Sequence, residues 1–315
     1  MKNRELSSFR DPSGYIYYEN DKVIRKINPC YFEEYEFLME SGLYNELIDK
    51  RLLISHKEIK NTKNEILLDV QKVPYISYPY EWTFEQLKSA ALITLEVNKI
   101  AMKYGMILKD ASCYNVEFIG TKPVFIDTLS FMFYKEGSPW GAYGQFTRHF
   151  VAPLLLMKNV DFRLNTLLKN YVDGIPLDLC TKLLGCKGGL TSYLHVKLQS
   201  KSINKHNMDG HKDLKNVKIS KKSILNMFTM LENQLSKLSI KQNKTEWDNY
   251  YNNSNYSLIS EEDKKNIICD FCKKIKINDS DIVFDLGSND GKYSKLVKNH
   301  SVPLTDNYRE RIGAD

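Results

Sequence analysis

The clearest pattern of apolar and polar positions in this 315-residue chain begins at Thr83. Apolar side chains recur from there at helical spacing, at Phe84, Leu87, Ala91, Leu95 and Ile100. One face of a helix would therefore be apolar throughout. Thr83-Phe84-Glu85-Gln86 matches the capping box of helix starts, and Gly105 stands where the helix would end. We predict a long amphipathic helix between Thr83 and Gly105.

Shorter patterns flank this helix. Residues 14–27 predict a β-hairpin that turns at Asn20-Asp21, and the apolar runs 66–70 and 73–76 predict further strands. Helical spacing follows the hairpin and resumes after residue 138, continuing to Leu184.

A polar segment rich in Lys, Asn and Ser, residues 199–222, has no periodicity and predicts a linker. An amphipathic helix follows, with apolar residues in steps of four and three, at Ile224, Phe228, Leu231, Leu235 and Leu238. We accordingly divide the chain into a first domain at 1–198, the linker at 199–222, the start of a second domain at 223–300, and an atypical tail at 301–315.

Composition and charge exclude several classes of protein. The net charge of +6, from 45 basic and 39 acidic residues, is spread along the chain, so nucleic acid is not an expected partner. No run of about 18 apolar residues could cross a membrane and the N-terminus has no signal core, which predicts a cytoplasmic protein without membrane contact. Cys269 and Cys272 have no second pair for zinc, and His149 beside an apolar patch is expected to be a buried structural side chain.

The stretch Ile282 to Gly291 runs from an apolar strand through Asp285 into a Gly-x-x-x-Gly turn and a helix start. Such turns let backbone N–H groups approach a cofactor closely. The stretch resembles motif I of the class I S-adenosylmethionine-dependent methyltransferases, and residues 245–251 with a helix near 261–274 resemble their lead-in. The resemblance implies the first βα unit of an α/β Rossmann-type domain. It also implies a cofactor loop of Asp285, Gly287, Ser288, Asn289, Asp290 and Gly291.

The residues after this turn do not continue the family pattern. A ribose-binding acid is expected about 20 residues beyond the turn, and residues 301–311 there show neither an apolar strand nor a helical stripe. We therefore expect a methyltransferase domain that is incomplete in this chain and binds S-adenosylmethionine weakly. The methyl acceptor is not identified by the sequence.

A second group of residues lies in the first domain. Asp110 is followed by Asn115 after five residues, and Asp127 ends an apolar strand after a turn at 120–122. In phosphoryl-transfer enzymes the first Asp accepts a hydroxyl proton, and the Asn and second Asp hold Mg²⁺ against the ATP phosphates. The layout resembles the α+β, two-lobed fold of protein kinases and aminoglycoside phosphotransferases, with residues 78–82 at the hinge.

Departures from the kinase pattern leave three interpretations open. Leu108-Lys109 replaces the His-Arg pair, Thr128-Leu129-Ser130 follows Asp127, and no glycine-rich loop is present. The only literal V-x-x-K match for the phosphate-binding Lys is Val23-Ile24-Arg25-Lys26, and Arg25 or Lys22 would serve the geometry about as well. The three residues would thus bind Mg-ATP in a working module, remain in an inactive kinase-like scaffold, or simply cap turns.

Taken together, a kinase-like domain before a methyltransferase domain resembles a bacterial family of S-adenosylmethionine-dependent methyltransferases related to nodulation-type proteins. Residues 78–82, 108–111 and 125–131 carry this resemblance in the first domain, and residues 245–300 carry it in the second. The resemblance implies a methyltransferase-family protein, with the kinase-like nucleotide-binding module or scaffold as the alternative.

Overall fold

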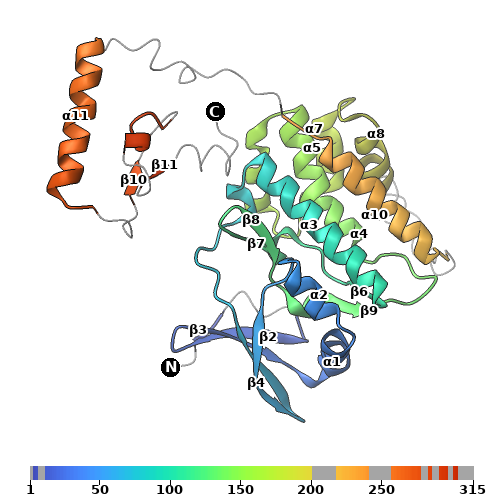
Figure 1. Ribbon diagram of the computed structural model, residues 1–315. Coiled ribbons are helices and arrows are strands. Elements are labelled where there is room, and N and C mark those ends of the chain that lie inside the picture. The colour runs from blue at the N-terminus through green and yellow to red at the C-terminus, as the bar shows by residue number, and fades with distance from the viewer. Residues whose placement is uncertain are drawn as a thin grey trace. The chain divides into compact units, whose positions relative to one another are not determined.

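The computed structural model describes residues 3–5, 11–200, 218–240, 257–277, 283–285, 291–296 and 301–303 (Figure 1). The chain forms two compact units, one of Met1–Trp82 with Gln86–Ser239 and one of Thr83–Glu85 with Ile240–Asp315. None of the helices in the described part of the chain is long and apolar enough to span a bilayer.

The first unit begins with a five-stranded antiparallel sheet in the order β1-β2-β3-β5-β4. Its strands are β1 (Asn3–Arg4), β2 (Gly14–Glu19), β3 (Lys22–Ile27), β4 (His56–Thr62) and β5 (Glu65–Val70). The hairpin predicted at 14–27 is confirmed. Asn20 and Asp21 both have positive φ, at 50° and 60°, which matches the twist of a two-residue hairpin turn.

The sheet buries one face against two short helices, α1 (Phe32–Glu40) and α2 (Leu43–Asp49). Alternate residues of β5 are buried, as expected of a strand with one face toward the core. The core cluster includes Ile27, Tyr31, Tyr35, Ile54, Ile66, Leu68, Val124 and Leu129. It therefore combines the sheet with residues from the middle of the chain.

The segment that connects β5 to the long helix corrects one prediction. Residues 73–76 do not form a strand: Pro74 removes a backbone donor, and Tyr75 and Ile76 are 73% and 48% exposed. We call residues 71–82 the connecting segment; it contains one 3-10 turn, η2 (Pro79–Glu81).

Two small antiparallel pairs follow the long helix α3 (Phe84–Lys103), which agrees with its prediction. Strand β6 (Met106–Leu108) pairs with β9 (Phe131–Phe133), and β7 (Val116–Ile119) pairs with β8 (Lys122–Phe125). Two 3-10 turns, η3 (Cys113–Asn115) and η4 (Thr128–Ser130), lie between them. The pairing of β6 with β9 brings the two ends of the segment 109–130 close together.

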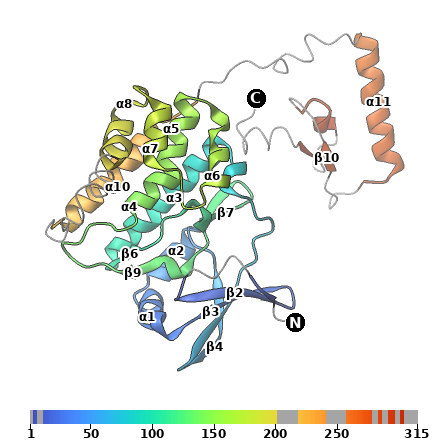
Figure 2. The same ribbon diagram turned by 180° about the vertical axis from the view of Figure 1, so that it is seen from behind.

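The rest of the first unit is helical, and these helices lie away from the five-stranded sheet (Figures 1 and 2). They are α4 (Tyr143–Phe146), the π-helical η5 (Thr147–Val151), α5 (Ala152–Asn159), η6 (Phe162–Thr166), α6 (Leu167–Asn170), α7 (Leu177–Leu184), α8 (Gly189–Thr191), the π-helical η7 (Ser192–Lys197) and α10 (Lys221–Ser236). The expected apolar face of α10 is buried. Phe228 meets Trp140 edge-on at 4.9 Å between ring centroids, and Glu232 pairs with Lys99 of α3 at 2.6 Å. The sequence pattern grouped α10 with the second domain at 223–300, but α10 packs on the first unit. Residues 201–217 of the predicted linker lie outside the described residues.

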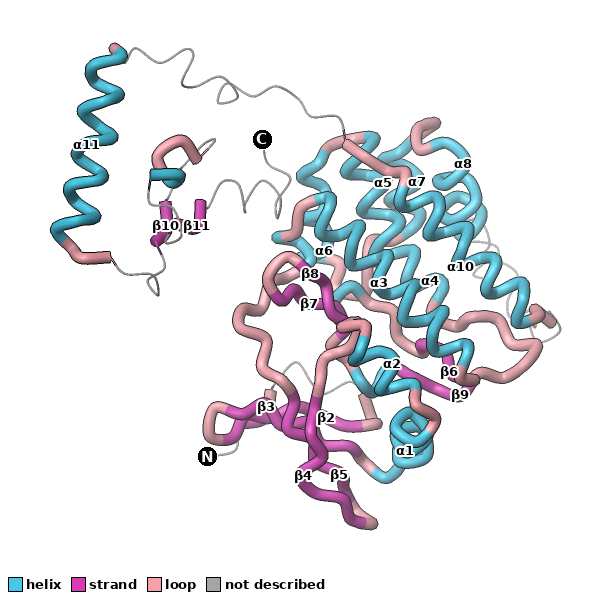
Figure 3. The backbone as a smooth tube through the Cα atoms, in the orientation of Figure 1, coloured by secondary structure: helices cyan, strands magenta, loops and turns pink. Residues whose placement is uncertain are grey.

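The second unit contains α11 (Leu258–Lys274), as predicted near 261–274, and the strands β10 (Val283–Asp285) and β11 (Ser301–Pro303) (Figure 3). These strands pair in parallel, Val283 opposite Ser301. The expectation of no strand in 301–311 is therefore wrong for residues 301–303. A three-residue strand defined by backbone pairing leaves too short an apolar pattern to be recognised.

Candidate functional site

Asp110 lies in the loop between β6 and η3. Its Oδ1 accepts hydrogen bonds from the backbone N–H of Ser112, at 3.0 Å, and from Nε2 of Gln145, at 2.8 Å. Gln145 Oε1 also accepts a hydrogen bond from the backbone N–H of Ala111 at 2.9 Å, so Gln145 of α4 holds this loop in place. Burial raises the pKa of Asp110, and the negative charge of Asp127 adds to this. A carboxyl with a raised pKa suits proton acceptance better than an ordinary surface Asp does.

Asp127 follows β8 and caps η4. Its Oδ1 accepts from the backbone N–H of Leu129 at 3.3 Å and forms an ion pair with Nη1 of Arg25, while Ser130 Oγ donates to Oδ2. Burial alone would raise the pKa of Asp127, but Arg25 and the hydrogen bonds from Ser130 and Leu129 hold it below its ordinary value. Asp127 is therefore ionised, and both of its oxygens are engaged.

Asn115 completes the group. Its side-chain Nδ2 donates to Ser130 Oγ at 3.2 Å, and its backbone carbonyl oxygen accepts a hydrogen bond from the backbone N–H of Ile126 at 2.8 Å. Ser130 thus links Asn115 to Asp127, and Asn115 also lowers the pKa of Asp110 by hydrogen bonding. The structure brings Asp110, Asn115 and Asp127 together. Asp110 and Asp127 each also accept a hydrogen bond from the backbone N–H two residues later in the chain. These residues therefore cap turns and also lie close together in one site.

Arg25 is the cation that reaches this site. It lies on β3, is 7% exposed, and places Nη2 at 3.4 Å from the carbonyl of Ile126. The other two candidates pair elsewhere: Lys22 with Asp69 at the surface, and Lys26 with Glu65 at 2.8 Å. The sequence could not distinguish the three; the alternation of side chains along β3 does, because Lys22 and Lys26 lie on the face opposite to Arg25.

Lys109 connects the site to the start of β2. Its Nζ donates to Ser13 Oγ at 2.8 Å, lies 3.7 Å from Asp11, and stands 4.7 Å over the ring of Tyr31. Tyr31 in turn donates to the carbonyl of Phe131 at 2.6 Å. The ammonium group of Lys109 thus has its partners within the chain.

Four residues at or near the site carried no sequence signal of their own: Ser130, Gln145, Ser112 and Cys113. The last two lie 3.4 and 3.2 Å from Nδ1 of His149. Burial lowers the pKa of His149 to about 4, so the ring is neutral at pH 7. His149 is the buried structural side chain that the sequence predicted.

Asp127 and Asn115 are the residues of this group that would hold a magnesium ion. Asp127 would be its carboxylate ligand and Asn115 its amide ligand, but Arg25 already supplies the countercharge. Within the described ranges, no cluster of three or more His, Cys, Asp or Glu side chains could hold a metal. A divalent ion at Asp127 would therefore lie beside the positive charge of Arg25.

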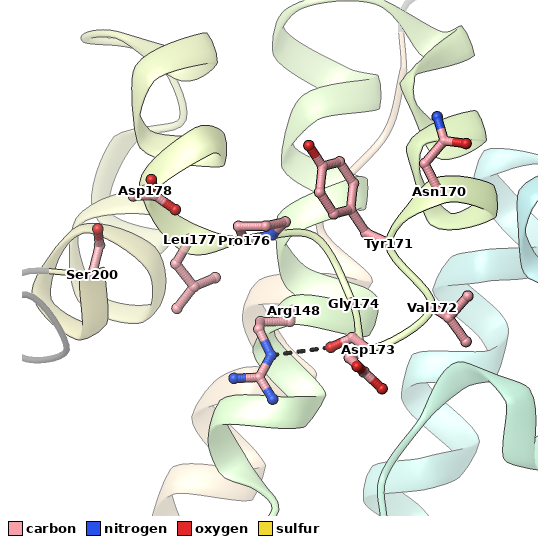
Figure 4. Close-up of a pocket in the computed structure, with 10 residues that line it drawn as sticks. All are labelled: Arg148, Asn170, Tyr171, Val172, Asp173, Gly174, Pro176, Leu177, Asp178 and Ser200. Atoms are coloured by element: carbon pink, nitrogen blue, oxygen red, sulfur yellow. Dashed lines mark hydrogen bonds between the residues drawn. The ribbon is translucent and has the colours of Figure 1, made fainter.

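A separate hollow of about 600 Å³ lies in the helical part (Figure 4). It is lined by residues 170–174 and 176–178 with Arg148 and Ser200, and Arg148 Nε donates to the carbonyl of Asp173 at 3.2 Å. It contains none of the three candidate residues.

The predicted cofactor loop of the second unit is only partly visible. Gly287, Ser288, Asn289 and Asp290 lie outside the described residues, and Asp285 is described only as the last residue of β10. Gly291 has φ of +71°, a conformation that favours glycine.

Comparison with known proteins adds one relative. No family model matches the chain. It is 28% identical over 308 residues to the nodulation protein NoeA of Rhizobium meliloti (strain 1021), which covers 93% of this chain and 63% of the relative. The chain thus spans less than two thirds of that relative's length.

Two solved structures are similar at 11% identity. Vaccinia related kinase 3 has a TM-score of 0.38, covering 76% of this chain and 86% of that one. WbdD has a TM-score of 0.34, covering 63% of this chain and 53% of that one.

Proposed function

We propose that the first unit is a kinase-like scaffold in which Arg25 takes the place of the metal ion at Asp127. The observation that carries this is the engagement of both Asp127 oxygens by Arg25, Ser130 and the Leu129 N–H. The scaffold retains the phosphotransfer residues as a structural centre and does not transfer phosphate while this ion pair is intact.

The order of elements supports the kinase-like assignment. A five-stranded sheet with α1 comes first, the connecting segment and α3 follow, and two strand pairs then surround Asp110, Asn115 and Asp127. The departures favour the inactive form. Leu108 provides no proton carrier beside Asp110, and Lys109 is held by Ser13.

Thermal unfolding of the whole chain with millimolar Mg-ATP, with ATP and chelator, and with neither would test this proposal. A ligand that binds only the folded state raises the melting temperature, so we expect no change for the wild type. A rise that requires Mg²⁺ and disappears in Asp127→Asn, but persists in the surface control Lys22→Ala, would instead establish the nucleotide-binding alternative.

We further propose that residues 283–303 begin an S-adenosylmethionine-binding domain of methyltransferase type. The parallel pairing of β10 with β11, with Gly291 at positive φ between them, supports this. Parallel strands need a crossover connection, and a glycine turn after the first strand is where such domains receive their cofactor. The methyl acceptor stays unassigned.

Calorimetry with S-adenosylmethionine would test this second proposal. We expect weak or no binding to the 315-residue chain, since β11 carries no acid for the ribose. A chimera in which residues 1–300 are continued by the part of the nodulation relative that lies outside the match should bind in the micromolar range. Gly287→Val in the chimera should abolish binding, whereas Gly141→Val, in open space on the first unit, should not. A chimera that folds without binding would contradict the proposal.

A further inference from the structure

The loop that carries Asp110 is held on both sides by one later segment of the chain, residues 140–145. On one side, Nε1 of Trp140 donates to the carbonyl oxygen of Leu108 at 2.9 Å. On the other side, Gln145 donates to the Asp110 carboxylate at 2.8 Å and accepts from the next backbone N–H at 2.9 Å. The orientation of Asp110 therefore depends on where residues 140–145 lie.

The segment 140–145 enters helix α4 without a capping side chain. Helix α4 begins at Tyr143, and its N-cap residue, Ala142, makes no side-chain hydrogen bond to the first turn. A capping side chain would satisfy the first N–H groups of the helix and stabilise its start. The first turn of α4 therefore relies on contacts with other elements.

Helix α10 supplies such contacts by two routes, and it lies beside α4 in both ribbon views (Figures 1 and 2). In the first route Phe228, fully buried, packs edge-on against Trp140 at 4.9 Å between ring centroids. In the second route Oε1 of Gln234 lies 2.9 Å from Nε2 of His195. Nδ1 of the same histidine lies 2.6 Å from the hydroxyl of Tyr143. Both routes thus end on the segment that holds the loop.

His195 is suited to join α10 to α4. It lies in the π-helical η7 and is 1% exposed, and burial lowers its pKa, so the ring is neutral at pH 7. A neutral imidazole has one donor and one acceptor. Its Nε2–H donates to the amide oxygen of Gln234, and its Nδ1 accepts from the hydroxyl of Tyr143. Both nitrogens of the buried ring therefore have partners.

We propose that Gln234 of α10 is a positioning residue for the candidate site, which holds the loop of Asp110 in place through the hydrogen-bonded chain to α4. Loss of its side chain should loosen the loop without detaching α10, because Phe228 stays buried and Glu232 stays paired with Lys99. The inference concerns the geometry of the loop. It does not depend on whether the site binds nucleotide.

The physical step is the loss of one hydrogen-bond acceptor in a buried place. Without the Gln234 amide, the Nε2–H of His195 has no partner, and an unsatisfied buried donor is unfavourable. The ring gains by turning toward another acceptor, and Tyr143 then loses its own hydrogen bond. Because α4 carries both Tyr143 and Gln145, this change weakens the hold of Gln145 on the loop.

Hydrogen exchange measured by NMR on the whole chain at one pH would test this. The reporters are the backbone N–H groups of Ala111 and Ser112, which donate to side chains of the site. Gln234→Ala should lower their protection by about fivefold, the effect of one lost hydrogen bond. The N–H of Ser77 in the connecting segment, which donates to Glu117 of β7, should keep its protection.

Two further variants complete the experiment. Asn233→Ala removes an exposed amide from the same helix and, as the matched control, should leave the protection of all three N–H groups unchanged. Tyr143→Phe removes the other end of the chain and should lower protection at the same two reporters. The double variant with Gln234→Ala should lose no more than the larger single loss. Unchanged reporters in Gln234→Ala, an equal fall at Ser77, or additive losses in the double variant would overturn the proposal.

Discussion

At the scale of single residues, the ion pair of Arg25 and Asp127 distinguishes this site from a metal-dependent one. The pair is largely buried, with 9% and 18% of the side chains exposed. Removing one partner from such a pair leaves an uncompensated charge, whereas removing both charges costs much less.

This leads to a prediction for unfolding in urea. Arg25→Met or Asp127→Asn alone should each lower the free energy of unfolding by about 3 kcal/mol. The double variant should cost clearly less than the sum, since it leaves no unpaired buried charge. The surface pair of Lys22 and Asp69 offers a control, because Lys22→Ala should cost less than about 1 kcal/mol. Additive effects of Arg25→Met and Asp127→Asn would show that the two charges do not interact.

Half-buried His56 and buried His149 predict that the free energy of unfolding depends on pH. Burial lowers the pKa values of His56 and His149 to about 4, so both are neutral when folded but protonated below about pH 6.5 when unfolded. Their contribution to stability is present above about pH 6.5 and is lost as the pH falls toward 4. Urea titrations at about pH 7 and about pH 5 should show this loss. His149→Gln should reduce the loss; an unchanged loss would refute the assignment to His149.

At the scale of elements, the periodicity of apolar residues predicted the helices and strands that depend on side chains close together in the sequence. The amphipathic stripe of α3, the hairpin at 14–27 and the apolar face of α10 all follow from side chains within one element. The strand β11 was missed, because it exists through backbone pairing with a distant partner. The same limit applies to the site. Asp110, Asn115 and Asp127 were recognised by their spacing, but the choice of Arg25 depends on a contact across 102 residues.

The docking of α10 gives a prediction at this scale. Phe228 is fully buried against Trp140, so Phe228→Ala should lower the free energy of unfolding by about 3–5 kcal/mol through lost burial and a cavity. Met230, on the same helix and 38% exposed, provides the matched control. Met230→Ala should cost less than about 1 kcal/mol. Equal effects in urea unfolding would mean that α10 is not packed on the first unit in solution.

At the scale of the whole molecule, the boundary of the first unit follows packing instead of composition. The polar residues 199–222 suggested a domain end near residue 198. Contacts place the end after α10, near Ser239, since Ile224, Phe228, Leu231 and Leu235 bury their side chains there. A polar segment marks a linker between elements, and only packing shows whether the elements on both sides share one core.

The last prediction compares two fragments. Residues 1–240 should unfold cooperatively and retain the stability of the first unit, because all the partners of α10 are present. Residues 1–200 lack α10 and would expose the face on which Phe228 packs. They should be less stable by several kcal/mol, at about 1.5–3 kcal/mol for each buried apolar side chain that loses its cover, and should bind a hydrophobic dye. Calorimetry or urea titration of both fragments would measure the difference. Equal free energies of unfolding would show that the first unit ends before α10, as the composition of the chain suggested.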